Sequence, residues 1–131
     1  MRAEIKLTKT MLNKSIIDAN KTVTKFLDED FGMKYTDPFF DIVGSDPLVA
    51  RCKFVVKGEY IDGEEANVTF YRSRRGDKRI SIQKLKKYAD AGDIVSLYSD
   101  SRDDGDGTRI FIQVYRPLPE DEDEAFNGWG S

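Results

Sequence analysis

Short segments in which apolar and polar residues alternate, separated by turn residues, limit most strongly how this chain can fold. The clearest spans residues 109–116, where Ile110, Ile112 and Val114 share one face. A period of two indicates a strand with one buried side. Strands this short leave open sheet edges unless the sheet curls and closes on itself. The pattern therefore predicts a barrel or a sandwich, and favours the barrel.

The other segments extend this prediction to one mostly-β domain. Turn-rich stretches containing glycine, proline and aspartate separate the predicted strands. Strands are predicted at residues 4–8, 50–56, 66–71, 79–82, 94–98 and 109–116. The length fits one hydrophobic core, so we predict a single domain over residues 1–118. Residues 119–131 follow as an acidic tail, which we predict to be disordered.

Two short helices are predicted between the strands. The first begins after Asp18 or Asn20, either of which is a suitable N-cap, and runs to about residue 28. Phe31 and Gly32 look like its exit, because glycine commonly ends helices. The second takes about two turns within residues 83–91. The predicted class is therefore mostly β with short helices.

The residue types present exclude several kinds of chemistry. The chain has no histidine and a single cysteine, Cys52, so serine–histidine and cysteine–histidine catalysis are excluded. A zinc site would need carboxylates alone, which is unfavourable. We predict no enzymatic activity, no metal and no cofactor. We predict a cytoplasmic protein for three reasons. The chain has a single cysteine, no apolar stretch of signal-peptide length, and no apolar run long enough to span a bilayer.

Positive charge is concentrated in one segment of an acidic chain. The sequence has 21 bases and 24 acids, but five of those acids are the consecutive residues 120–124. Between Arg72 and Lys87 there are eight bases and only one acid, Asp77. Serine, glycine and aspartate mark the first half, residues 72–79, as a loop between two strands. Arginine predominates there, and its planar guanidinium bonds guanine or phosphate in bidentate fashion.

A second, weaker basic cluster lies near the N-terminus. Lysines at positions 6, 9, 14 and 21 alternate with small polar residues. Small polar side chains beside lysine suit contacts with phosphates and base edges.

The order of these parts resembles the DNA-binding pseudobarrel family. That fold occurs in the N-terminal effector domain of EcoRII-type restriction endonucleases and in the plant "B-three" transcription-factor domain. Residues 7–31 are similar to the family's opening strand, first arm, second strand and helix. Residues 67–81 look like the strand, basic loop and strand that carry its second arm. Residues 85–95 are similar to its short helix and glycine–aspartate turn. The resemblance implies a seven-stranded open pseudobarrel over roughly residues 5–116.

The resemblance also implies a binding mode and its residues. In that family two loops project like a wrench into the major groove of duplex DNA. Carried over, the first arm consists of Lys9, Thr10, Asn13, Lys14 and Ser15. The second arm consists of Arg72, Ser73, Arg74, Arg75, Lys78 and Arg79.

Departures from the plant branch favour the restriction-effector branch. No glycine–tryptophan pair follows Ile80 and Ser81, and no proline follows Ile17. The resemblance extends to the effector domain alone, so it does not imply cleavage. The expected partner is double-stranded DNA, in a phage or in a bacterial restriction or anti-restriction setting.

Two alternatives stay open. The acidic tail, with Phe126 and Trp129 after its carboxylates, is typical of single-stranded-DNA-binding proteins that recruit a protein partner. An oligonucleotide-binding barrel of that kind would stack bases on exposed aromatics. The candidates are Tyr60, Tyr71, Tyr98 and Phe111. The other alternative is a phage-encoded inhibitor of a host protein, which would use its acidic surfaces.

Overall fold

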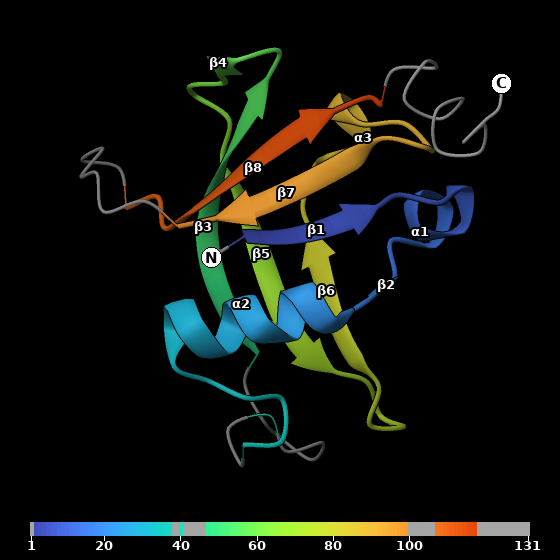
Figure 1. Cartoon of the computed structure of the whole chain (residues 1–131), viewed down its shortest axis with the longest axis vertical. Helices are drawn as coiled ribbons and strands as arrows, with labels where there is room; N and C mark the ends of the chain where they lie inside the picture. Colours follow the sequence, from blue (N-terminus) through green and yellow to red (C-terminus); the bar gives the residue numbers. More distant parts are fainter. Residues whose placement is uncertain (1, 38–39, 41–46, 100–106, 118–131) are drawn as a thin grey trace, which may run out of the picture.

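The structure is a computed structural model, and it describes residues 2–37, 40, 47–99 and 107–117. Within these residues eight strands form one curled, half-barrel sheet (Figure 1). They are β1 (Arg2–Lys6), β2 (Ile17–Asp18), β3 (Leu48–Val56), β4 (Glu59–Tyr60), β5 (Ala66–Arg72), β6 (Lys78–Ile82), β7 (Ile94–Tyr98) and β8 (Ile110–Tyr115). The prediction of a mostly-β, barrel-like fold is confirmed.

The strands follow one continuous path of hydrogen-bonded neighbours. Seven of the described strands lie in the order β1-β7-β8-β3-β5-β6-β2, and β4 pairs with β3 beside that path. The β3–β8 pair is parallel, with Phe54 opposite Ile112, and the other described pairs are antiparallel. The last strand of the fold is therefore inserted at the centre of the sheet. Strands β1 and β2 are left as its two edges.

Three helices occur in the described residues, one more than predicted: α1 (Lys9–Lys14), α2 (Lys21–Phe31) and α3 (Leu85–Tyr88). The Asn20 side chain caps α2 by accepting from the Val23 amide, and Gly32, with φ of 66°, ends it. The predicted cap alternative Asp18 lies in β2 instead. Helix α3 has one turn rather than two, because the chain is already extended at Ala89.

The first arm is helical rather than an extended loop. Thr8 caps α1 by accepting from the Met11 amide at 3.2 Å, and Ser15 ends it in the left-handed conformation with φ of 55°. Met11 and Leu12 pack against the core. These two apolar contacts and the threonine cap explain why so short a segment forms a helix.

The core lies between α2 and the sheet. Phe26 on α2 contacts Phe70 on β5, with ring centroids 6.5 Å apart, and Phe31 lies 6.0 Å from the same ring. Cys52 is buried in β3, as its sequence context predicts, and burial raises the pKa of its thiol to about 12. A thiol with this pKa stays protonated and inert near neutral pH.

Side chains at the start of α2 cover the edge of β1. The Glu4 amide donates to Thr22 Oγ1 at 2.9 Å, and Asn20 Nδ2 donates to the Glu4 carbonyl at 2.8 Å. Asn20 directly follows the segment that contains β2, the other edge strand. The edge of β1 is therefore hydrogen-bonded to side chains that follow β2. The two edge strands themselves do not pair in a ladder.

Two predictions about the termini lie outside what the structure describes. The acidic tail at residues 119–131, and the domain boundary placed after residue 118, fall beyond the last described residue, Pro117. In the described residues, no helix combines the length and the apolar character that crossing a membrane demands.

Candidate nucleic-acid interface

The second arm is the tight hairpin that joins β5 to β6. Tyr71 lies opposite Arg79 in the antiparallel ladder, and the loop 73–77 closes it. The Ser73 amide donates to the Asp77 carbonyl at 2.9 Å, and the Gly76 amide donates to the Ser73 carbonyl at 2.8 Å. Gly76 has φ of 90°, a conformation that residues with a Cβ rarely adopt. The predicted basic loop is thus a compact hairpin at the lower right of Figure 1.

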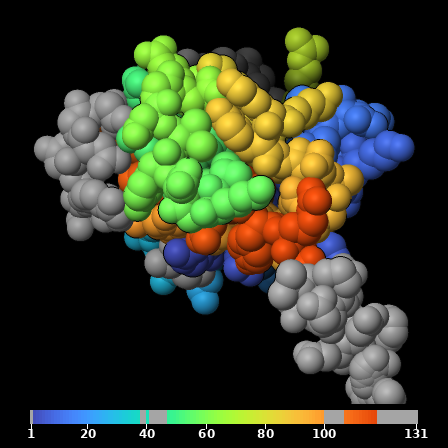
Figure 2. Space-filling model, turned by 90° about the horizontal axis from the view of Figure 1, so that it is seen from above, coloured from blue at the N-terminus to red at the C-terminus, as the bar shows by residue number. Residues whose placement is uncertain are grey.

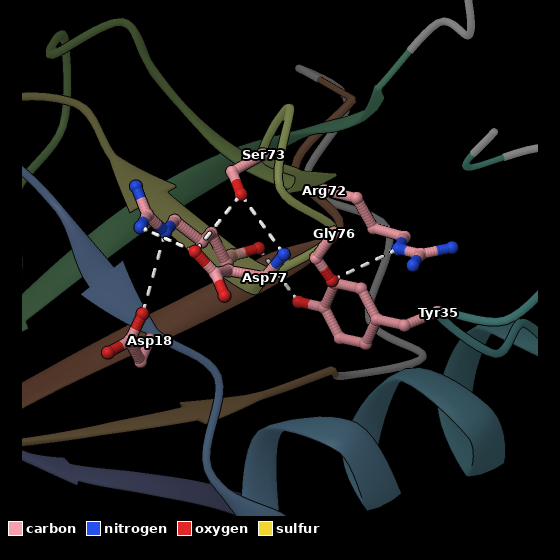
Figure 3. A network of polar contacts seen from close by, with 7 residues as sticks. Asp18, Tyr35, Arg72, Ser73, Gly76 and Asp77 are labelled. Atoms are coloured by element: carbon pink, nitrogen blue, oxygen red, sulfur yellow. Dashed lines mark hydrogen bonds and ion pairs between the residues drawn. The ribbon is translucent and has the colours of Figure 1, made fainter. Parts of the chain in front are cut away.

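Several side chains of the arm bond within the loop itself (Figure 3). Asp77 donates its amide to Ser73 Oγ at 3.0 Å, and the serine hydroxyl donates to the Asp77 carboxylate at 3.2 Å. Arg72 Nε donates to the Gly76 carbonyl at 3.3 Å. Ser73 and Arg72 therefore stiffen the hairpin, which limits the entropy lost when its tip contacts a ligand.

Arg79 anchors the base of the hairpin. One terminal nitrogen lies 3.0 Å from the Asp77 carboxylate, and Nε lies 3.5 Å from Asp18 on β2. The arginine carbonyl accepts from the Tyr35 hydroxyl at 2.9 Å. Burial raises the pKa of Tyr35 well above its ordinary value, so this hydroxyl remains a donor. The Arg79 side chain is only 18% exposed, and its contact with Asp18 holds β6 against β2. That Arg79 also contacts nucleic acid stays a prediction.

Arg74, Arg75 and Lys78 differ from their neighbours. All three are exposed, and within the described part of the chain none of their side chains makes a hydrogen bond or an ion pair. The hairpin stands clear of the body in the view of Figure 2, where it is olive. Two guanidinium groups and an ammonium are therefore presented to solvent on a stiffened support.

The first arm presents a second group of polar side chains. Five of its residues are exposed: Lys9, Thr10, Asn13, Lys14 and Ser15. They belong to α1 and its C-cap, and α1 is held to the body through Met11 and Leu12.

The two arms lie at opposite ends of β6. Strand β2, which follows α1, runs antiparallel to β6, with Ile17 opposite Ile80. The first arm is therefore near Ile82, whereas the second arm adjoins Lys78. Four residue steps separate these ends, a distance of about 13 Å in a strand. This spacing is similar to the width of the DNA major groove, about 12 Å.

Comparisons with known proteins give no relative for this arrangement. No protein-family model, curated protein or solved structure matches the chain. What the site binds must therefore be inferred from its side chains.

The second half of the basic segment is not an open cationic surface. Glu64, in the turn before β5, lies 2.8 Å from Lys84 and 2.7 Å from Lys87, and it also accepts from the Tyr88 hydroxyl. Hydrogen bonds from these lysines lower the pKa of Glu64 to about 2, so the carboxylate stays ionised down to strongly acidic pH. The sequence alone gave no sign of this pairing, because 20 positions separate Glu64 from Lys84.

Three of the four aromatic residues of the single-strand alternative pack against one another, and the fourth, Tyr71, is half-buried. Phe111 is 1% exposed. Tyr98 stacks on it with centroids 5.6 Å apart, and Tyr60 meets it edge-on at the same distance. Arg2 lies 4.2 Å above the Tyr98 ring. We call these four residues the outer row, because each contacts the next in the order Arg2, Tyr98, Phe111 and Tyr60. Phe111 is already covered and has no face to offer a base.

The described residues also contain no group of three or more metal-ligating side chains close together. In the described part of the chain, the hairpin and α1 present exposed cationic side chains, whose charge is complementary to that of an anion.

Proposed function

We propose that this protein is a non-catalytic double-stranded-DNA-binding protein that places its two arms in the major groove. The observation that supports this most strongly is the pair of exposed arginines, Arg74 and Arg75, on a stiff hairpin where no described carboxylate neutralises them. Guanidinium groups held out in this way suit bidentate contacts with guanine or phosphate. The length of β6 between the two arms, about 13 Å, is similar to the width of the major groove, which supports a fit to it.

The two arms contact different parts of the duplex. Arg74 and Arg75 contact base edges and adjacent phosphates, while Lys78 contacts a phosphate at the base of the hairpin. Lys9 and Lys14 on α1 hold the opposite strand. This proposed arrangement resembles that of the pseudobarrel family, and we propose membership of its restriction-effector branch. A phage or bacterial restriction or anti-restriction system is a setting for such a unit, as a repressor, a shield over restriction sites or an effector.

A salt titration tests the proposal. The full chain is titrated into a labelled duplex and into one strand of the same sequence, and binding is followed by fluorescence anisotropy. If the five exposed cations each neutralise one phosphate, log K falls against log salt with a slope of about −4 to −5. Duplex affinity then drops several hundredfold between about 50 and 200 mM salt.

The same titration separates the alternatives. A preference for the single strand favours the alternative of a single-stranded-DNA-binding protein with an oligonucleotide-binding barrel. Absence of binding to either form, or a flat salt dependence, contradicts the proposal and favours a protein partner. Repeating the titration on a chain truncated after Pro117 shows whether the acidic tail weakens binding.

A further inference from the structure

A cavity of about 170 Å³ lies beside the first arm, between α1, β2, β6 and α3. Its apolar lining comes from Met11, Leu12, Ile82 and Leu85, and Ser15 and Ser81 add hydroxyl groups. In Figure 2 the blue surface of the α1 region lies next to the gold surface of the region around α3. Met11 and Leu12 also hold α1 to the body, whereas Ile82 and Leu85 belong to neither arm.

The polar groups at the cavity are available to a ligand. In the described residues neither the Ser15 nor the Ser81 hydroxyl has a hydrogen-bond partner. Lys86 also lines the cavity, is exposed and has no described ion pair, whereas Lys84 is held by Glu64. Ser15 and Lys84 both adopt left-handed conformations, with φ of 55° and 62°. Such backbone strain in residues other than glycine clusters at ligand sites.

The size of the cavity limits what it can hold. An apolar protein cavity of about 150 Å³ binds benzene, a single six-membered ring. A pyrimidine base is also one six-membered ring, with polar substituents on its edge. Apolar walls suit the faces of such a ring, and two hydroxyls suit its edge. A purine, with two fused rings, is larger than the single ring for which a cavity of this size is known.

The cavity lies next to the first arm, which we propose to contact DNA. It opens beside Ser15 of the first arm, at the Ile82 end of β6, where the proposed duplex lies. We propose that this cavity receives a single pyrimidine base turned out of the duplex that the two arms hold. This inference rests on the proposed function. Extruding a base costs a few kcal/mol, and the cost is smallest where the base is mispaired.

Three duplexes that differ at one central pair test the inference: fully matched, with a T·T mismatch, and with an A·A mismatch. The wild-type chain should bind the T·T duplex about tenfold more tightly than the matched duplex, because the mismatch lowers the cost of extrusion. The A·A duplex should show a smaller gain, since a purine is larger than the single ring that the proposal places in the cavity.

Variants at Ser81 give the matched control. Ser81→Leu fills the cavity and should abolish the T·T preference while leaving matched-duplex affinity within about twofold. Ser81→Ala removes the hydroxyl but keeps the space, so it should retain most of the preference. If Ser81→Leu does not fold, Leu85→Phe fills the same cavity from α3, which belongs to neither arm.

The outcomes distinguish this inference from the proposed function. Equal affinity for all three duplexes, or an equal gain for T·T and A·A, overturns the cavity proposal and leaves duplex binding intact. A loss of matched-duplex binding in Ser81→Leu also overturns it, because the cavity then belongs to the general footprint. Failure of the wild type to bind any duplex overturns both.

Discussion

Replacing Arg74 and Arg75 together with alanine is expected to weaken duplex binding by a factor between about 30 and 10⁴, since each bidentate contact contributes about 1–3 kcal/mol. The two side chains are exposed and have no described partner, so their removal takes no internal contact from the fold. Anisotropy titration with the same duplex measures the loss, and the free energy of unfolding should change little.

The matched control is the double variant Lys86→Ala, Lys87→Ala. It removes the same formal charge from the same segment, but Lys87 is engaged with Glu64 at 2.7 Å and belongs to neither arm. Its effect on duplex affinity should be at most about tenfold, as for the loss of one or two screened phosphate contacts. Equal, small effects of the two double variants would count against contact between the hairpin and DNA.

Asn20→Ala is expected to lower the free energy of unfolding by about 1–3 kcal/mol, which combines the loss of a helix cap with that of a hydrogen bond. The asparagine accepts from the Val23 amide at 3.0 Å, and it donates to the Glu4 carbonyl on the edge of β1 at 2.8 Å. One side chain thus starts α2 and bonds it to β1. Urea denaturation of both proteins, followed by circular dichroism, measures the difference.

A second substitution separates the two roles of Asn20. Asn20→Asp keeps an oxygen that accepts from the Val23 amide, but it cannot donate to the Glu4 carbonyl. Its stability should therefore lie between those of the wild type and Asn20→Ala. If Asn20→Asp is as stable as the wild type, the bond to β1 contributes nothing and only the cap matters.

The sequence predicts well those elements whose signal is local. Alternation located β8 from Ile110, Ile112 and Val114, because a strand with one buried face repeats every two residues. The cap at Asn20 and the glycine at position 32 bounded α2, because each satisfies backbone groups at a helix end. These features need only neighbouring residues, and they describe most of the sheet and one helix.

The features that the sequence does not predict depend on contacts between residues far apart in the chain. Arg79 looks like part of a cationic loop, yet it pairs with Asp18, which lies 61 positions earlier and meets it only because β2 pairs with β6. Strand β4, of two residues, is too short to carry a periodic pattern. Helix α1 forms because Met11 and Leu12 pack against the core. That contact exists only in the folded, curled sheet.

The most direct test of the central claim is an NMR titration of the full chain with a short duplex, followed through backbone amide chemical shifts. If both arms enter one groove, the amides of residues 9–15 and 72–78 should shift together and saturate at the same ratio of DNA to protein. Amides of the outer row, such as Tyr98 and Phe111, should stay unchanged. Shifts confined to the outer row, or to one arm alone, would contradict the two-armed account.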